Sequence, residues 1–276
     1  MTRLGFSSSG SATSTLNLKQ ALWQTLRRVK WRVDSVLDKC GYTLQKKVEG
    51  FSFFSQLLNE RIKTSTEIVF VQIGANDGTS FDPLYPLIKK SPRQFRGLVV
   101  EPLKDKFELL KRAYADIESV IPVNMAVHNT EKEMMIHRVR PDLEKRLGPW
   151  ARGIGSFDSE HYKLSYLHNS LMVTERVICT TFDALLAAHN ISNIELLITD
   201  TEGYDFEILR NIDLAKHRPV YIHFEHGLPV GLMSWEQYKD LIRYMTQHGY
   251  NISHETHDAT AFLPEALRPE LPDKTT

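Results

Sequence analysis

Two carboxylates and a histidine follow two apolar segments late in the chain and could carry out acid–base chemistry. Asp200 comes directly after the apolar run 194–199, and Glu225 and His226 follow the run 220–224. Carboxylates and imidazoles are the side chains that most often take a proton from a reacting hydroxyl. We therefore predict that Glu225 or His226 removes the acceptor's proton and that Asp200 orients the cofactor or the acceptor.

Three further polar residues are predicted to contact the acceptor. Glu202 lies two positions after Asp200. Successive side chains of a strand alternate between its two faces, so His223 shares a face with Glu225. Ser156 belongs to a glycine-containing segment that could close over a substrate and exclude water.

The same residues allow other roles. Asp200 and Glu202 could cap a helix that starts near Tyr204, and His223 could be a strand histidine with an internal partner. A divalent metal held by the acidic and histidine side chains would acidify an acceptor hydroxyl. Because these residues lack the spacing of a ligand motif, we predict no metal site.

A turn rich in small residues and a distant carboxylate together indicate a nucleoside site. Gly74, Asn76, Asp77 and Gly78 lie in a short turn directly after an apolar run, and glycine and asparagine tolerate the positive φ angles of such turns. Glu101 ends the next apolar run, where an acidic residue can accept hydrogen bonds from both ribose hydroxyls. The turn is not Gly-x-Gly-x-x-Gly, which favours a cofactor without a pyrophosphate over NAD.

Short apolar runs alternate with helical patterns from residue 66 onward. The expected strands cover 68–73, 97–100, 120–127, 134–139, 177–180, 194–199, 220–224, 250–254 and 259–263. The expected helices cover 82–90, 104–114, 182–188, a stretch from 205 onward and 235–248. This alternation predicts a doubly wound α/β fold with a mostly parallel sheet covered on both faces. Ligands of such sheets bind at the carboxyl ends of the strands, where the turn and both sets of polar residues are expected.

Four segments are predicted along the chain. Residues 1–15 are rich in Ser, Thr and Gly and are expected to be disordered, and 16–65 form a helical N-terminal extension. The α/β domain covers 66–265, and 266–276 form a C-terminal tail. Within the domain, 140–175 lack a clear period and hold several glycines and prolines, so we expect an acceptor-binding loop there.

Composition and charge narrow the classes of function. Lys+Arg and Asp+Glu both number 34, and this balance disfavours a nucleic-acid partner. Neither a signal peptide nor an apolar run of eighteen residues is present, so we expect a cytoplasmic protein. Residues 19–37 form an apolar stripe opposite basic residues, which suits peripheral contact with an anionic membrane or, alternatively, packing on the core or on another subunit. The sequence does not specify an oligomeric state.

Several blocks occur in an order that resembles the FkbM-type methyltransferases. They include Phe-Val-Gln-Ile-Gly-Ala-Asn-Asp-Gly at 70–78, Val-Val-Glu-Pro at 99–102, Asn-Met-Ala-Val at 124–127, Gly-Ser-Phe-Asp at 155–158, Asp-Thr-Glu-Gly-Tyr-Asp at 200–205 and Phe-Glu-His at 224–226. The resemblance covers about 67–262. It implies a seven-stranded, Rossmann-like class I methyltransferase sheet with S-adenosylmethionine as the methyl donor.

The resemblance also implies roles for particular residues. The glycine turn and Glu101 would hold the methionine and ribose parts of the cofactor, and Met125 and Ala126 would lie beside the adenine. The usual reaction is O-methylation, which implies a hydroxyl acceptor on a sugar, a glycan or another small molecule. Many members carry a Lys at the position of Ile198, so this chain departs from the pattern two residues before Asp200. The main alternative is a non-catalytic adenosine-binding or scaffold protein on the same fold.

Overall fold

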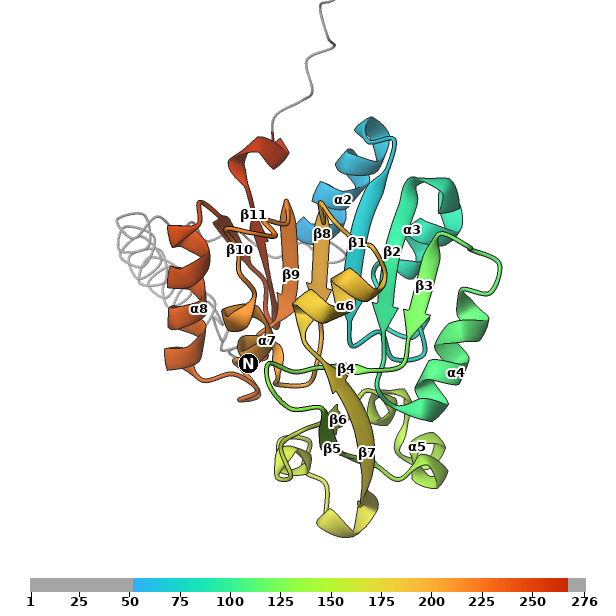
Figure 1. The fold of residues 1–276 in the computed structure, drawn as a ribbon. Coiled ribbons are helices and arrows are strands. Elements are labelled where there is room, and N and C mark those ends of the chain that lie inside the picture. Colours follow the sequence, from blue (N-terminus) through green and yellow to red (C-terminus); the bar gives the residue numbers. More distant parts are fainter. Residues whose placement is uncertain (1–51, 268–276) are drawn as a thin grey trace, which may run out of the picture. The chain divides into compact units, whose positions relative to one another are not determined.

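The computed structural model describes residues 52–267. The predictions for 1–15 and for the amphipathic helix at 19–37 lie outside the described residues, as do most of the predicted extension and of the C-terminal tail. A seven-stranded sheet forms the centre of the described part, in the order β10-β11-β9-β8-β1-β2-β3 (Figure 1). These strands are β1 Ile68–Ile73, β2 Phe95–Val100, β3 Val120–Val123, β8 Leu196–Thr199, β9 Tyr221–Glu225, β10 Asn251–His254 and β11 Asp258–Phe262.

Strand β11 runs antiparallel to both of its neighbours, whereas the pairs β3–β2, β2–β1, β1–β8 and β8–β9 are parallel. The order of strands along the chain reverses at β1, which lies between β2 and β8. In an open α/β sheet, such a reversal leaves a crevice at the carboxyl ends of the strands. The predicted doubly wound, mostly parallel sheet is therefore confirmed.

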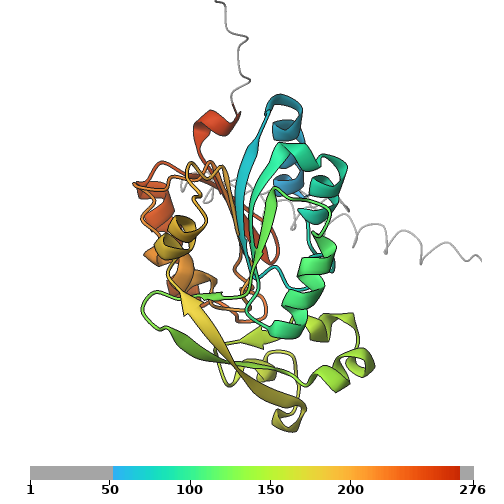
Figure 2. The same ribbon diagram turned by 45° about the vertical axis from the view of Figure 1, so that its right-hand side comes forward.

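Helices cover both faces of this sheet (Figure 2). The helices α2 Phe53–Thr64, α3 Tyr85–Lys90 and α4 Lys104–Ala113 pack on one face, and α6 Phe182–Ala188, α7 Asp205–Asn211 and α8 Trp235–Gln247 pack on the other. In β1, Ile68 and Phe70 join the core under α2 to α4, while Val69 and Val71 join the core under α6 to α8. Both faces are buried, which is why the strand is a continuous apolar run. Within 52–267, no helix is long and apolar enough to cross a membrane.

A second, smaller sheet lies beyond the carboxyl ends of the central strands (Figure 1). Its order is β4-β7-β5-β6, and β5 and β7 pair as a long antiparallel ribbon. The strands are β4 Ala126–Val127, β5 Glu133–Val139, β6 Gly155–Ser156 and β7 Met172–Thr180, and helix α5 covers Pro141–Leu147. Single helical turns occur at Pro92–Gln94, Pro149–Arg152, His161–Lys163, Asn169–Leu171 and Pro264–Leu267. We call residues 126–180 the cap.

The cap corrects two of the predictions. The expected strand 120–127 is two strands, because the chain leaves the central sheet at Asn124, whose side-chain amide donates to the carbonyl oxygens of Glu101 (2.8 Å) and Pro102 (2.9 Å). The expected irregular loop 140–175 contains α5, β6 and the first part of β7. Strand β7 starts five residues earlier than predicted, because its first half is a partly exposed antiparallel arm in which only Met172 and Val173 are apolar, too few to form an apolar run.

A cluster of charges around the buried guanidinium of Arg138 joins the cap to the central domain. Arg138 in β5 is 1% exposed, and its guanidinium binds Asp105 of α4, Glu144 of α5 and Glu175 of β7 at 2.5 to 3.0 Å. Lys106 of α4 donates to Glu144 at 2.6 Å. Removing one member of a buried ion cluster leaves an uncompensated charge, so these contacts fix the cap in one position over the strand ends.

Candidate active site

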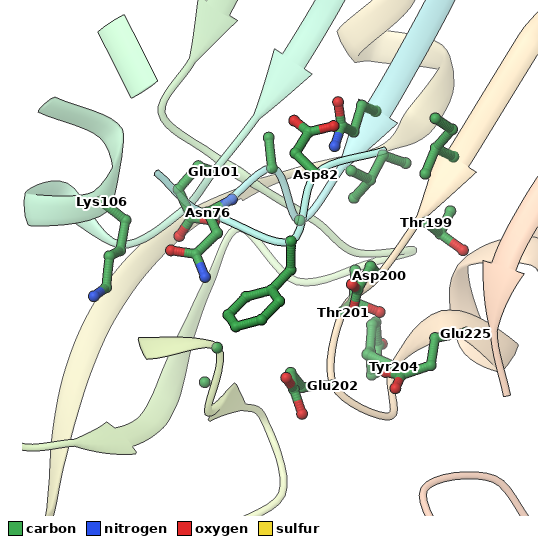
Figure 3. Close-up of a pocket in the computed structure, with 18 of the residues that line it drawn as sticks. Asn76, Asp82, Glu101, Lys106, Thr199, Asp200, Thr201, Glu202, Tyr204 and Glu225 are labelled. Atoms are coloured by element: carbon green, nitrogen blue, oxygen red, sulfur yellow. Dashed lines mark hydrogen bonds between the residues drawn. The ribbon is translucent and has the colours of Figure 1, made fainter. Parts of the chain in front are cut away.

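A cavity of about 560 Å³ opens at the carboxyl ends of β1, β2, β8 and β9. The cap supplies part of its wall, including Trp150, Gly153 and Phe157. Figure 3 shows Asn76, Glu101 and Lys106 on one side of the cavity and Asp200, Glu202 and Glu225 on the other. This position and size are typical of ligand sites in doubly wound sheets.

The predicted turn and the predicted carboxylate face one another. Gly74 has a φ of 85°, and a Cβ atom there would lie 1.8 Å from the carbonyl oxygen of Asp200. Only glycine therefore allows β1 to pass so close to the end of β8. Asn76 has a φ of 49°, and its backbone N–H donates to Glu101 Oε2 at 2.9 Å. Its side-chain amide donates to the carbonyl oxygen of Arg152 at 3.2 Å, which joins the turn to the cap.

Glu101 is buried, and both of its carboxylate oxygens accept backbone hydrogen bonds. Oε1 accepts from Leu103 N at 2.8 Å and Oε2 from Asn76 N at 2.9 Å. Burial raises its pKa to about 7, although these hydrogen bonds and the charges of Arg138 and Lys106 oppose the shift. Each oxygen keeps a lone pair, so the carboxylate can accept two more hydrogen bonds from a ligand in the cavity.

The other predicted cofactor residues divide into two groups. Met125, which directly precedes the cap, and Ala126, the first residue of the cap, line the cavity. Asp77 and Gly78 are absent from its lining. The Asp77 carboxylate accepts from Thr79 N at 2.9 Å and Ser80 N at 2.7 Å, and a Cβ atom on Gly78 would lie 2.5 Å from a methyl of Leu110. In this structure Asp77 and Gly78 build the turn and pack it on α4, and their contact with the cofactor stays a prediction.

Asp200 and Glu225 form a pair of carboxyl groups at the opposite end. Burial and the negative charge of Asp200 raise the pKa of Glu225 to about 10, and burial together with Glu202 raises that of Asp200. Glu225 Oε2 has no hydrogen-bond donor among the described residues other than a proton shared with Asp200. Two adjacent carboxylates cannot both ionise readily, so when one member of the pair is ionised the other keeps its proton. The ionised member is a base that faces the cavity.

His226 lies on the other side of the sheet, contrary to the prediction that it faces the acceptor. It does not line the cavity and is 3% exposed. Its ring contacts Tyr238 of α8, with 5.0 Å between ring centroids, and its Nδ1 accepts from Leu228 N at 3.2 Å. Burial lowers its pKa. Strand alternation places Glu225 and His226 on opposite faces, and the helices decide which face has the cavity.

His223 lines the cavity, and its ring is also held by the protein. It stacks on Phe54 of α2 with 4.1 Å between ring centroids, and its Nδ1 lies 3.0 Å from Thr260 Oγ1. Burial lowers its pKa to about 4, so the ring is neutral at physiological pH. His223 therefore offers a neutral surface to a ligand.

Glu202 lines the cavity, whereas Ser156 supports it from behind. Glu202 has a φ of 53°, and its Oε2 lies 3.2 Å from His161 Nε2. Ser156 Oγ donates to the backbone carbonyl of Glu202 at 2.8 Å and is absent from the cavity lining, so its contact with the acceptor stays a prediction. Neither Asp200 nor Glu202 caps α7. Asp205 instead accepts from the backbone N–H of Thr201 at 3.0 Å, so the capping alternative is excluded.

Several residues of the lining were not predicted from the sequence, among them Gln72, Phe81, Asp82, Lys106 and Tyr204. A buried polar residue inside an apolar strand, as Gln72 is, was an available signal. Phe81 has a φ of 60° and is 77% exposed, which no local pattern indicates.

Ile198, where many family members have a Lys, also lines the cavity. Gln72 pairs with Ile198, and Ile198 pairs with His223 in the next strand, so the three side chains form one row across the sheet. An apolar side chain therefore occupies the place where many family members would present a cation. Among residues 52–267, no group of three or more His, Cys, Asp or Glu side chains is arranged to hold a metal ion.

Comparisons with solved structures give weak similarities. Fibrillarin from Aeropyrum pernix with natively bound S-adenosyl-L-methionine is 12% identical, with a TM-score of 0.37 over 72% of this chain and 66% of that chain. A TehB-like SAM-dependent methyltransferase from Corynebacterium glutamicum is 11% identical, with a TM-score of 0.37 over 88% and 98%. TrmK from M. capricolum in complex with S-adenosyl-homocysteine is 11% identical, with a TM-score of 0.36 over 77% and 67%. Because these scores are low, the fold assignment rests on the strand order. The match covers 66% of the fibrillarin from Aeropyrum pernix, so this chain spans slightly less than two thirds of that protein.

A search of curated proteins gives no significant match. The profile of the Methyltransferase FkbM domain, however, matches residues 72–252, which is most of the described structure. The match includes the turn, Glu101 and the carboxyl pair, and the sheet around them has the seven-stranded class I arrangement. The chain belongs to the FkbM methyltransferase family, whose members use S-adenosylmethionine as the methyl donor.

Proposed function

We propose that this protein transfers a methyl group from S-adenosylmethionine to a hydroxyl oxygen of an uncharged sugar or glycan. The observation that carries the proposal is the Asp200–Glu225 pair. In its singly ionised form the pair has one proton and one negative charge in the cavity wall, and Asp200 adjoins Gly74 of the turn at 74–78, which we call the cofactor turn. A hydroxyl needs such a base because its proton is not lost spontaneously at neutral pH.

The residues present fit the cofactor. Glu101 has two oxygens with spare lone pairs for the ribose hydroxyls, and Met125 and Ala126 offer an apolar surface for the adenine. The close approach of β1 and β8 at Gly74 leaves the strand ends open to a ligand. Bound there, S-adenosylmethionine supplies an electrophilic methyl group on a sulfonium.

The chain's contribution to the reaction is alignment and proton removal. The ionised member of the Asp200–Glu225 pair would take the hydroxyl proton while the acceptor oxygen takes the methyl group, which bound S-adenosylmethionine would supply with S-adenosylhomocysteine as the leaving group. Holding both reactants in line supplies up to about 7–11 kcal/mol of the barrier, whereas a general base supplies about 10²–10⁴-fold in rate. We therefore assign Asp200 and Glu225 as the base, and the cap and strand ends as the aligning frame.

The charge around the acceptor end favours an uncharged acceptor. Asp200, Glu202, Glu225 and Asp258 all line it, and the Ile198 side chain next to them is apolar. These carboxylates accept hydrogen bonds from hydroxyls and repel phosphates or uronates.

Two exposed aromatic side chains also suit a sugar. Phe81 is 77% exposed and Trp150 is 46% exposed, and both line the cavity. An aromatic face packs against the apolar C–H face of a sugar ring while the ring hydroxyls remain available for hydrogen bonds. Because Trp150 belongs to the cap, an acceptor held there would lie between the cap and the strand ends.

The test measures the release of S-adenosylhomocysteine from S-adenosylmethionine with the purified full-length chain. Neutral hexoses and 6-deoxyhexoses, free and as methyl glycosides, are compared with uronic acids, sugar phosphates and amines. We expect turnover with neutral sugars, and loss of about 10²-fold or more in Asp200→Asn and Glu225→Gln with cofactor affinity retained.

His226→Asn serves as the matched control, because His226 directly follows the same strand but faces α8. We expect it to keep cofactor binding and most of the turnover per folded molecule. Methylation of amines or carboxylates alone, or full activity in both carboxyl variants, would contradict the proposal.

A further inference from the structure

Gln72 and Asp82 lie together in a part of the cavity wall that the reaction does not use. Gln72 is the penultimate residue of β1 and is 5% exposed, although it is polar. Asp82 follows the cofactor turn and precedes α3. Both side chains line the cavity, and the Gln72 amide lies close enough to Asp82 to favour its ionised form. Figure 3 shows Asp82 beside the end of β1, between Glu101 and Thr199.

Each of the two side chains keeps a buried acceptor oxygen without a donor. Asp82 Oδ1 accepts from Leu84 N at 2.7 Å and Tyr85 N at 3.1 Å, but Oδ2 has no hydrogen-bond partner among the described residues. Gln72 Oε1 is also buried, and it likewise has no hydrogen-bond partner among the described residues. A buried acceptor left unpaired costs about 1–3 kcal/mol, so two neighbouring ones indicate a donor that arrives with a ligand.

A cation is the donor that satisfies both oxygens. The charge of Asp77 contributes to raising the pKa of Asp82, so the two carboxylates lie near each other and their ionised forms would attract a cation. Among residues 52–267, no Lys, Arg or His forms an ion pair with Asp82. An ammonium group has three N–H donors and a positive charge, and therefore matches a carboxylate oxygen and an amide oxygen together.

We propose that Asp82 and Gln72 bind a primary ammonium group, namely that of the amino-acid end of S-adenosylmethionine. The strand ends give the order of the cofactor's parts. Met125 and Ala126 follow β3 and Glu101 follows β2, so a ligand with its adenine and ribose there extends next toward β1. Gln72 and Asp82 are the polar residues at the end of β1, on the side of the sheet that also carries Glu101.

Tyr114 is the structural competitor for Asp82. Its hydroxyl is buried without a partner among the described residues, and the charge of Asp82 contributes to raising its pKa, so the two groups are near each other. Tyr114 does not line the cavity. If the role of Asp82 were to accept from Tyr114, then Tyr114→Phe would have the same effect on ligand binding as a change at Asp82.

Three ligands separate the ammonium from the sulfonium. S-adenosylmethionine has both cations, S-adenosylhomocysteine has only the ammonium, and 5′-methylthioadenosine has neither. Calorimetry would measure their dissociation constants with the wild-type chain and with Asp82→Asn, which keeps the acceptor for Leu84 and Tyr85. We expect about 10- to 100-fold weaker binding of the first two ligands and less than about 2-fold change for methylthioadenosine.

Other outcomes would overturn the assignment. Loss confined to S-adenosylmethionine would place the sulfonium at Asp82, and equal loss for all three ligands would show a distorted cavity. Unchanged binding of S-adenosylhomocysteine would remove the ammonium site. Tyr114→Phe is the matched control, with all three constants expected within about 2-fold of wild type, and thermal unfolding establishes that both variants fold. Because no acceptor is present, these results are independent of the proposed hydroxyl acceptor.

Discussion

Replacing Glu225 by glutamine is expected to lower turnover by about 10²-fold or more and yet to stabilise the folded protein. Glu225 keeps its proton in the folded state up to a pKa of about 10, whereas an unfolded glutamate loses it near 4.5. Folding therefore takes up a proton between these values, and the free energy of unfolding falls as pH rises through the same window. A glutamine at this position has no proton to take up, and its amide can still donate to Asp200.

The magnitude follows from the separation of the two pKa values. The pH of 7 is 2.5 units above the pKa of 4.5 that glutamate has in the unfolded chain. Each pH unit between the two pKa values lowers the free energy of unfolding by about 1.4 kcal/mol. The side chain is partly open to cavity water, which screens the effect. We therefore expect Glu225→Gln to gain about 1–3 kcal/mol at pH 7, or about 2–12 °C in melting temperature.

The assay is thermal and urea unfolding of the ligand-free chain at pH 5, 7 and 9. The free energy of unfolding that Glu225→Gln gains over wild type should be largest at pH 9 and nearly absent at pH 5. Asp116→Asn is the control, because Asp116 is an exposed carboxylate whose pKa is lowered by its hydrogen bond to Lys89. Its replacement should give no gain at any of these pH values. A Glu225→Gln variant that is less stable than wild type at pH 7 and 9, or a difference that does not change with pH, would refute the shared-proton account.

Three further predictions concern the cofactor site and the far face of the sheet. The pKa of Glu101 is about 7, and ribose hydroxyls bind its ionised form. The affinity for S-adenosylmethionine should therefore fall below pH 7, and binding at pH 6 should release about one proton. A dissociation constant that does not change with pH would contradict this. Gly74→Ala would place a Cβ atom 1.8 Å from a backbone oxygen, so we expect either no folded protein or loss of cofactor binding, and a variant that binds normally in calorimetry would disprove the close approach. His226→Asn should lower the melting temperature by removing a buried ring from its contact with Tyr238, while turnover per folded molecule stays within about 3-fold of wild type; a larger loss of turnover would return His226 to the reaction.

The sequence by itself determined the order of the elements and the position of the cofactor turn. The apolar run 68–73 is a strand with the same bounds in the structure, because a strand buried on both faces needs no partner information to be recognised. Glu101 at the end of the second strand and Gly74 at the end of the first were likewise predicted, since parallel strands bring their carboxyl ends to one edge.

Only the tertiary structure decided which polar side chains face the cavity. Alternation put Glu225 and His226 on opposite faces, but the packing of α8 against one face and the opening of the cavity on the other made the first a site residue and the second a core residue. The roles of Asp77 and Ser156, and the proximity of Gln72 to Asp82, depend in the same way on contacts between distant or turning segments. The local sequence determines the spacing of apolar residues and therefore whether a segment is a helix or a strand. Which face of the sheet remains open to water or a ligand is set by the helices that pack against that sheet.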